Sequence, residues 1–297
     1  MLKALMYHDI RDYKDTNYPS RLQLKSFMTL VEFKNQLQYI SKNYNIIRSH
    51  EIAEYQHCSN HKNVILTFDD GLQDHYNVAE ILSDMNIPGT FFIPTLAIRD
   101  GVVIKSHKIQ FILAALSETT LVQRILESTP DYVSNTYLWE KYSVSKWKDN
   151  WWSPEMVFTT NILRDYDVDN SITDSLFANI VTADEIGFCN EFYLSELNIH
   201  NMINAGHDIG AHGYTSDGLT LISNQEYDIT ESLKYIRKFH QNDLIYSYPN
   251  GLYDTNTIEL MSKHGCEYAY TTNKSVIDND TSMLEIPRFD ASQDIKI

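Results

Sequence analysis

Apolar positions along the chain follow two patterns that alternate from the first residues onward. Residues 2–7, 64–68 and 89–94 form short, mostly apolar runs, which are typical of buried strands. Residues 30–43 and 76–85 instead repeat apolar positions at helical spacing, with polar residues between them, which predicts amphipathic helices. Strands that alternate with helices predict parallel βαβ units, and therefore an α/β barrel or a doubly wound sheet.

The C-terminal half of the chain returns to this alternation. Helices are predicted at 194–205, 225–240 and 255–264, and strands at 208–211, 244–248, 267–271 and 284–287. The elements of both halves therefore belong to a single predicted domain that spans residues 1–297.

Residues 100–183 interrupt the alternation. Segments 108–116 and 120–127 are predicted helices, and the stretch from Trp139 to Trp152 is aromatic and mixed in charge. We interpret 100–183 as a largely helical insertion that serves as a lid, a substrate-recognition flap or an oligomer contact. Exposed aromatic side chains suit sugar faces, but tryptophans in a helical insertion more often pack its own small core.

Composition and charge exclude several classes of partner. The 297 residues are 43% hydrophobic, which predicts a folded protein with a substantial core. The net charge of −16 argues against non-specific binding to nucleic acid or anionic membrane, and most simply keeps the protein soluble. No segment approaches the ~20 consecutive apolar residues of a membrane span.

The cysteines and the N-terminus bear on the cellular compartment. Cys58, Cys189 and Cys266 are odd in number and form no CxxC pair, so we expect free thiols in a reducing environment. The N-terminus carries neither a long apolar segment nor a small-residue cleavage site. We therefore expect a cytoplasmic location.

Two adjacent carboxylates, Asp69 and Asp70, follow the apolar run 64–68 and precede Gly71. In parallel α/β folds the carboxyl ends of the strands line the active site. Neighbouring carboxylates repel each other, and a bound cation is the usual way to offset that repulsion. The alternative is structural, in which the pair caps the following helix and forms a turn with Gly71.

Two further strand ends carry candidate residues. His212 follows the strand 208–211 between two glycines, which suits a metal ligand, although a lone histidine is more often structural. The turn 249–251 follows the strand 244–248, and its backbone N–H groups could face an oxyanion. Pro-Asn-Gly is also an ordinary turn sequence.

Taken in order, these segments resemble the polysaccharide deacetylase family, also called NodB-homology or carbohydrate esterase family 4 proteins. Residues 67–71 resemble the first family motif, and residues 206–215 resemble the second. Residues 6–10 are similar to the start of many family members, and residues 88–93 to the strand after the first motif. Residues 248–251 resemble the third motif, and residues 286–288 resemble the closing strand. The resemblance covers roughly residues 1–98 and 185–290.

The resemblance implies a distorted barrel of about seven parallel strands with outer helices. It implies that Asp69 is the general base, and that Asp70 and His212 bind a divalent metal ion, zinc or similar. The oxyanion would rest on the metal and on a backbone N–H near Asn250. We also expect His8 to contact the carbohydrate substrate, and we assign Tyr248 to substrate binding as well.

The second motif departs from the family pattern. Four residues after the first histidine, where the family has another, this chain has Ser216, a poor zinc ligand. Asp217, His8 and His75 are the candidate substitutes. We interpret Asp217 as a turn residue and His75 as a surface or helix-start residue, which leaves His8 as the best candidate for the pocket.

The third motif and the closing strand depart as well. The family's arginine before the proline of the third motif is absent, because residues 246–248 read Tyr-Ser-Tyr. Arg288 could pair with Asp69, bind an anionic group, or form a structural salt bridge. The family's late Leu-x-His, which supplies the general acid, is also absent, so the proton for the leaving group would come from water, His8 or Asp290.

The leading interpretation is a metal-dependent hydrolase that removes an N-acetyl group from an amino sugar of a surface glycan or its precursor. A second interpretation, favoured by Ser216, is a catalytically impaired relative that binds carbohydrate or a partner. A third retains a hydrolase and changes the substrate to another small amide. The retained Asp69 and Asp70 favour the enzyme, because a binding protein has no reason to keep a repelling pair.

Overall fold

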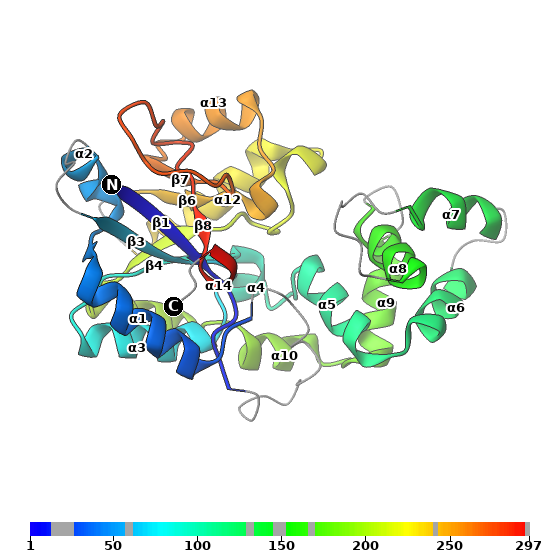
Figure 1. The fold of residues 1–297 in the computed structure, drawn as a ribbon. Coiled ribbons are helices and arrows are strands. Elements are labelled where there is room, and N and C mark those ends of the chain that lie inside the picture. The colour runs from blue at the N-terminus through cyan, green and yellow to red at the C-terminus, as the bar shows by residue number, and fades with distance from the viewer. Residues whose placement is uncertain are drawn as a thin grey trace.

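The computed structural model describes residues 1–12, 27–56, 62–128, 134–144, 153–165, 170–239 and 243–294 (Figure 1). Its centre is a parallel sheet of strands β1 (Leu2–Tyr7), β2 (Asn45–Ile46), β3 (Asn63–Phe68), β4 (Thr90–Ile93), β5 (Asp208–Ala211), β6 (Ile245–Ser247), β7 (Tyr268–Tyr270) and β8 (Phe289–Asp290). Seven of these strands follow the order β7-β6-β5-β4-β3-β1-β8, and β2 pairs with β3. Strand β3, which lies between β4 and β1 in this order, is buried along its whole length.

The segment 286–290 closes the sheet into a distorted barrel. Its first residue, Ile286, forms a parallel bridge with Tyr270 at the end of β7. Strand β8 follows directly and pairs with Leu5 and Met6 of β1. The predicted strand at 284–287 is therefore wrong in its bounds, because this short segment serves two neighbouring strands in succession. The predicted α/β barrel of about seven strands is confirmed.

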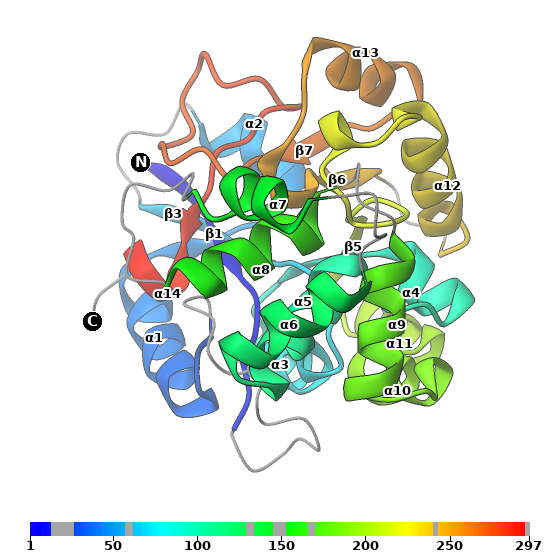
Figure 2. The same ribbon diagram turned by 90° about the vertical axis from the view of Figure 1, so that its right-hand side faces the viewer.

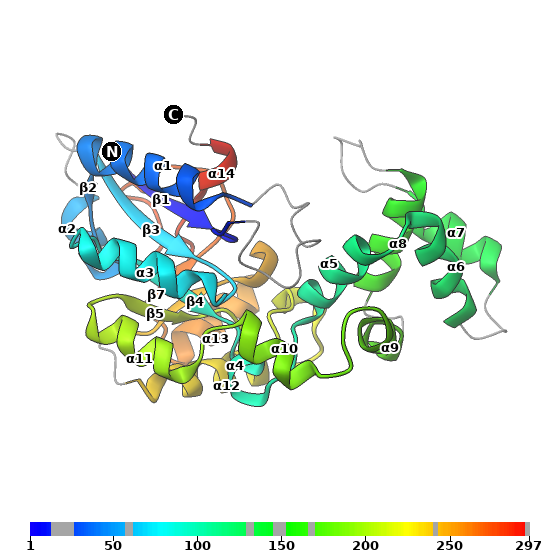
Figure 3. The same cartoon turned by 90° about the horizontal axis from the view of Figure 1, so that it is seen from below.

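Helices α1 (Leu30–Asn43), α3 (Asp74–Asp84), α11 (Glu196–Asn204), α12 (Gln225–Arg237) and α13 (Thr255–Lys263) surround the barrel (Figures 1 and 3). The first of them begins and ends where the apolar pattern predicts. Its N-terminus is fixed by a capping box, in which the Thr29 side chain accepts a hydrogen bond from the Glu32 backbone N–H, and the Glu32 carboxylate accepts one from the Thr29 backbone N–H. Shorter helices are α2 (Ile52–Tyr55), α4 (Thr95–Asp100) and α14 (Ala291–Asp294).

A lobe of six helices leaves the barrel after α4 and returns before α11 (Figures 1 and 2). They are α5 (Lys105–Ala115), α6 (Glu118–Ser128), α7 (Asn135–Tyr142), α8 (Pro154–Arg164), α9 (Asn170–Ile180) and α10 (Glu185–Phe192). We call these helices the insertion. They share an apolar core, apart from that of the barrel, in which Trp139 stacks on Phe158 with ring centroids 5.0 Å apart. Trp147, Trp151 and Trp152 lie outside the described residues.

Two further sequence expectations concern thiols and membranes. Cys189 and Cys266 are free, as expected, and both are buried, whereas Cys58 lies outside the described residues. Among the helices that the structure describes, none combines the length and the apolar character needed to cross a bilayer.

Candidate active site

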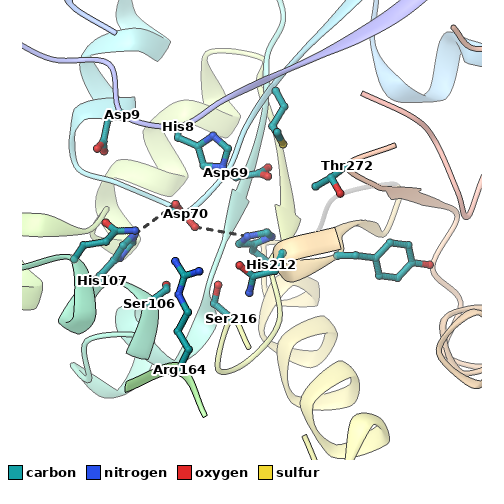
Figure 4. A pocket seen from close by; sticks show the side chains of 14 residues that line it. His8, Asp9, Asp69, Asp70, Ser106, His107, Arg164, His212, Ser216 and Thr272 are labelled. Atoms are coloured by element: carbon teal, nitrogen blue, oxygen red, sulfur yellow. Dashed lines mark ion pairs between the residues drawn. The ribbon is translucent and has the colours of Figure 1, made fainter. Parts of the chain in front are cut away.

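The carboxyl ends of β1, β3, β5 and β6 meet at a cavity of about 200 Å³ (Figure 4). Six of the seven residues that the sequence predicts for the site line this cavity, namely His8, Asp69, Asp70, His212, Tyr248 and Asn250. The seventh, Arg288, is bonded to Asp69 from within the barrel. Because these six residues follow the ends of their strands, the parallel order of the sheet brings distant segments together.

Asp69 is held by Arg288 in a two-pronged ion pair. The Nη1 atom of Arg288 donates to Oδ1 of Asp69 at 2.7 Å, and Nη2 donates to Oδ2 at 2.8 Å. The guanidinium also donates to Thr67 Oγ1, Ser247 Oγ and the Thr271 carbonyl, which satisfies its polar groups inside the barrel. Burial alone would raise the pKa of Asp69, but the charge and hydrogen bonds of Arg288 outweigh burial and lower it.

The backbone at Asp70 is turned sharply out of the strand direction. Asp70 has a φ of 80°, which is sparsely populated by residues other than glycine, and Gly71 follows at 59°. A side chain at Gly71 would lie 3.0 Å from Ile93 Cγ2. Helix α3 begins only at Asp74, with Gln73 as its N-cap. The alternative in which the aspartates cap this helix is therefore wrong, and the turn instead directs the Asp70 carboxylate into the cavity.

Two imidazoles approach the Asp70 carboxylate from opposite sides in Figure 4. The Nε2 atom of His212 lies 3.6 Å from Oδ1, and the Nε2 atom of His107 lies 3.4 Å from Oδ2. Burial alone would raise the pKa of Asp70, but the hydrogen bond from His107 and the positive charge that His107, His8 and His212 carry when protonated lower it. The carboxylate is therefore ionised at neutral pH.

The loop of the second motif remains ordered although Ser216 replaces a histidine. Asp228 on α12 accepts the backbone N–H groups of Tyr214 and Thr215, each at 2.9 Å, together with the Thr215 hydroxyl. Ser216 is buried, has a φ of 61° and lines the cavity. Neighbouring Asp217 does not line the cavity, and its backbone N–H bonds to Thr215 within the loop. This placement agrees with a turn role for Asp217.

The third motif supplies a strained turn and a packed tyrosine. Asn250 has a φ of 56° within the turn Pro249–Gly251, where the Gly251 N–H donates to the Tyr248 carbonyl. The ring of Tyr248 stacks on Tyr253, and its hydroxyl donates to the carbonyl of Leu284. Tyr248 therefore packs the wall of the cavity, and its assignment to substrate binding stays a prediction.

Of the three remaining candidates from the sequence, His8 lines the cavity, whereas His75 and Asp290 do not. His8 lines the cavity, and its buried Nδ1 atom has no hydrogen-bond partner within the described residues. His75 is the second residue of α3, is fully buried, and bonds through Nε2 to the His8 carbonyl. Its interpretation as a helix-start residue is therefore confirmed, and the surface alternative is wrong. Asp290 accepts hydrogen bonds from Ser292 at the start of α14 and does not line the cavity.

The insertion contributes a part of the cavity that the sequence analysis missed. Ser106, His107 and Gln110 come from α5, and Arg164 comes from the end of α8. No motif spacing links these residues to the barrel motifs. The one available signal was a histidine in the first turns of the helix that follows the first half of the barrel. The cavity is therefore a joint feature of the barrel and the insertion.

The chemistry of the donor groups fits a cation between Asp70 and His212. The Nδ1 atom of His212 lies 3.0 Å from the carbonyl of Ser247, which only accepts, so the ring hydrogen resides on Nδ1. Its Nε2 lone pair then faces an ionised carboxylate, an arrangement that requires a proton or a cation. The described residues contain no group of three histidine, cysteine or acidic side chains placed to share an ion. Asp70 and His212 are thus two side chains at the cavity whose donor atoms suit a metal ion, and Ser216 lines the same cavity.

A closed parallel barrel with carboxylates and imidazoles at the carboxyl ends of its strands is the architecture in which barrel enzymes build their active sites. The family model described as polysaccharide deacetylase matches residues 160–269, which include the second and third motifs. This match agrees with the resemblance to the polysaccharide deacetylase family that the motifs predict. A comparison with curated proteins gave no match.

Solved structures agree on the fold at low sequence identity. The Streptococcus pyogenes deacetylase PplD, in complex with acetate, is 16% identical, with a TM-score of 0.60 over 97% of this chain and 91% of that one. IcaB from Ammonifex degensii is 16% identical, with a TM-score of 0.56 over 99% and 92%. A polysaccharide deacetylase from Bacillus cereus is 16% identical, with a TM-score of 0.56 over 97% and 63%. These likenesses extend the fold assignment over nearly the whole chain.

Proposed function

We propose that this protein is a metal-dependent hydrolase that removes an N-acetyl group from an amino sugar. The observation that carries the proposal is the pairing of two differently held carboxylates at one cavity. Asp69 is fixed by Arg288, whereas Asp70 faces His212. One carboxylate is thereby available for proton transfer and the other for holding a cation, which are the two tasks of such a hydrolysis.

Asp69 is the general base in this proposal. Arg288 occupies one direction of approach to each carboxylate oxygen and leaves the carboxylate edge at the cavity open to a water molecule. Since the pKa of Asp69 is lowered, the carboxylate stays ionised and ready to accept a proton at neutral pH. The rigid pair also holds the base at one position, which limits the entropy lost when water is aligned for attack.

Asp70 and His212 hold the divalent ion, for which zinc is the leading candidate. When bound there, the ion supplies Lewis acidity toward the acetyl carbonyl and lowers the pKa of the attacking water. The Asn250 turn lies at the same cavity and offers a backbone N–H to the developing oxyanion. Asp69, His212 and Asn250 lie far apart in the sequence and come together at one cavity because the carboxyl ends of their parallel strands meet there.

His8 is the proposed source of the proton for the leaving amine. Of the protein candidates for the general acid, His8 lines the cavity, whereas Asp290 serves the turn into α14. A buried imidazole nitrogen without a hydrogen-bond partner is unusual in folded proteins, and a ligand that enters the cavity can satisfy it. His8 therefore acts on the substrate in this scheme, as the sequence suggests.

The substrate class follows from the family and from the relatives' descriptions. The matching family model and the Bacillus cereus relative are both described as polysaccharide deacetylase, and the PplD structure is described as a complex with acetate. Acetate is the product expected when an N-acetyl group is hydrolysed. We therefore infer an N-acetylated amino sugar, within a glycan or its precursor, as the substrate.

An acetate-release assay tests the proposal. The full chain, loaded with zinc, is incubated with N-acetylglucosamine oligomers, a nucleotide-linked N-acetyl sugar and a panel of small cyclic amides. Acetate release from the sugars, lost in Asp69→Asn, supports a deacetylase. Turnover of cyclic amides alone would change the substrate class. Absence of zinc binding together with binding of unhydrolysed sugar would favour the carbohydrate-binding alternative, which the serine at position 216 also favours.

A further inference from the structure

His107 reaches the candidate active site from outside all the family motifs. It lies in the first turn of α5, at the start of the insertion, and only 2% of its surface is exposed. Its ring packs edge-on against Phe192, with ring centroids 5.1 Å apart, and lies against Tyr193. The imidazole is therefore held rigidly where α5 and α10 meet the barrel.

The hydrogen bonds of Tyr193 indicate which nitrogen of His107 carries the proton. The Tyr193 hydroxyl oxygen accepts the backbone N–H of Ile104 at 3.3 Å and lies 2.7 Å from Nδ1 of His107. The arrangement that uses every hydrogen has the hydroxyl donating to Nδ1. The ring hydrogen then resides on Nε2, which faces Oδ2 of Asp70 at 3.4 Å. His107 therefore donates to the carboxylate.

His212 presents the opposite tautomer to the same carboxylate. Because its Nδ1 donates to the Ser247 carbonyl, its Nε2 offers a lone pair toward Oδ1 of Asp70. The two oxygens of Asp70 are thus differentiated. One is tethered by an N–H from the insertion, and the other faces an imidazole lone pair across a gap of 3.6 Å that suits a cation.

We propose that His107, oriented by Tyr193, is a positioning residue that fixes Asp70 for cation binding, so that the insertion is a working part of the metal site. The inference rests on the proposed metal-dependent function. The physical reason for this role is that the site offers few protein ligands to a cation. The backbone of Asp70 is in the sparsely populated left-handed region, and position 216 offers only a serine. A site with few protein ligands gains most from holding each of them in place.

Zinc affinity of the full chain, measured by competition with a chromogenic chelator, tests this role. His107→Ala removes the tether and is expected to weaken zinc binding about 10- to 100-fold. His107→Gln places an amide N–H near the position of Nε2, and is expected to restore most of the affinity although glutamine is a poor zinc ligand. Tyr193→Phe is expected to give an intermediate loss, since the ring remains and only the hydroxyl is removed.

Thermal unfolding of each variant controls for folding, and His200→Ala, on the exposed side of α11, controls for the loss of a histidine. Equal zinc affinity in the wild-type protein and His107→Ala overturns the inference and leaves the proposed function intact. An equal loss in His107→Gln and His107→Ala also overturns it, because His107 would then be a direct ligand. A wild-type protein that binds no zinc overturns the inference and the metal-dependent function together.

Discussion

The guanidinium of Arg288 and the carboxylate of Asp69 form a parallel two-bond pair inside the barrel, with N–O distances of 2.7 and 2.8 Å. Both side chains are almost completely buried. Arg288 lies on the segment that closes the barrel between β7 and β1, whereas Asp69 follows the fully buried strand β3. The segment that closes the barrel therefore also positions the proposed general base.

Replacing Arg288 is expected to cost both stability and activity. Arg288→Met leaves the Asp69 carboxylate buried without a counter-charge, and breaking such a pair typically destabilises a protein by about 3–5 kcal/mol. Chemical denaturation measures that loss of unfolding free energy. The double variant Asp69→Leu/Arg288→Met removes both charges, so it is expected to recover part of the stability and none of the activity. A double variant no more stable than Arg288→Met would contradict the ion-pair explanation.

Asp69→Asn separates catalysis from metal binding. The amide retains the size of the side chain and one acceptor for Arg288, but it cannot take a proton from water. We expect zinc affinity to stay near that of the wild-type protein, while kcat falls by roughly 10²- to 10⁴-fold. Acetate release and chelator competition on the same preparation measure the two quantities. Normal turnover in this variant would show that Asp69 is not the general base.

Much of the barrel could be predicted because its strands are apolar and its helices amphipathic. The bounds of β1, α1 and β5 agree with the pattern, since mostly buried runs define the two strands and buried positions at helical spacing define the helix. The closing strand could not be placed correctly, because residues 286–290 pair with two different strands in succession. Only the folded sheet shows which residues of this segment pair with β7 and which pair with β1.

The candidate site was predictable where it consists of strand ends and obscure where it depends on the insertion. Parallel strands bring their carboxyl ends together, so Asp69, Asp70 and His212 could be grouped from sequence order alone. His107 could not be found in this way, because nothing in the pattern of α5 indicates which helical face meets the barrel. Arg288 was foreseen as a partner of Asp69, one of three roles considered, and the structure shows that pair.

Restoring the family's histidine at position 216 is expected to strengthen metal binding. Ser216 lines the cavity beside Asp70 and His212, so an imidazole there adds a third protein ligand. Histidine is among the residues that tolerate a φ of 61°. We expect Ser216→His to lower the zinc Kd roughly tenfold or more. Ser216→Asn is the matched control, since it tolerates the same backbone and is a poor zinc ligand; equal gains in both variants would show that position 216 does not reach the ion.

Buried His75 makes the stability of the fold depend on pH. Burial lowers its pKa from 6.5 to about 4, so the folded protein keeps this ring neutral through the mildly acidic range. The unfolded chain binds a proton near pH 6.5, whereas the folded protein does so only near pH 4. Unfolding free energy is therefore highest above pH 6.5 and falls as the pH drops toward 4, by about 3 kcal/mol from this residue.

His75→Gln provides the measurement of that contribution. Glutamine places an N–H near the position of Nε2, so the bond to the His8 carbonyl can be kept, but it does not titrate. Denaturation curves at several values between pH 7.5 and 4.5 should show a shallower decline for the variant, whatever its stability at neutral pH. Buried His207, whose pKa is also lowered, accounts for part of the decline that remains. Parallel declines in the two proteins would mean that the His75 ring is protonated within the fold.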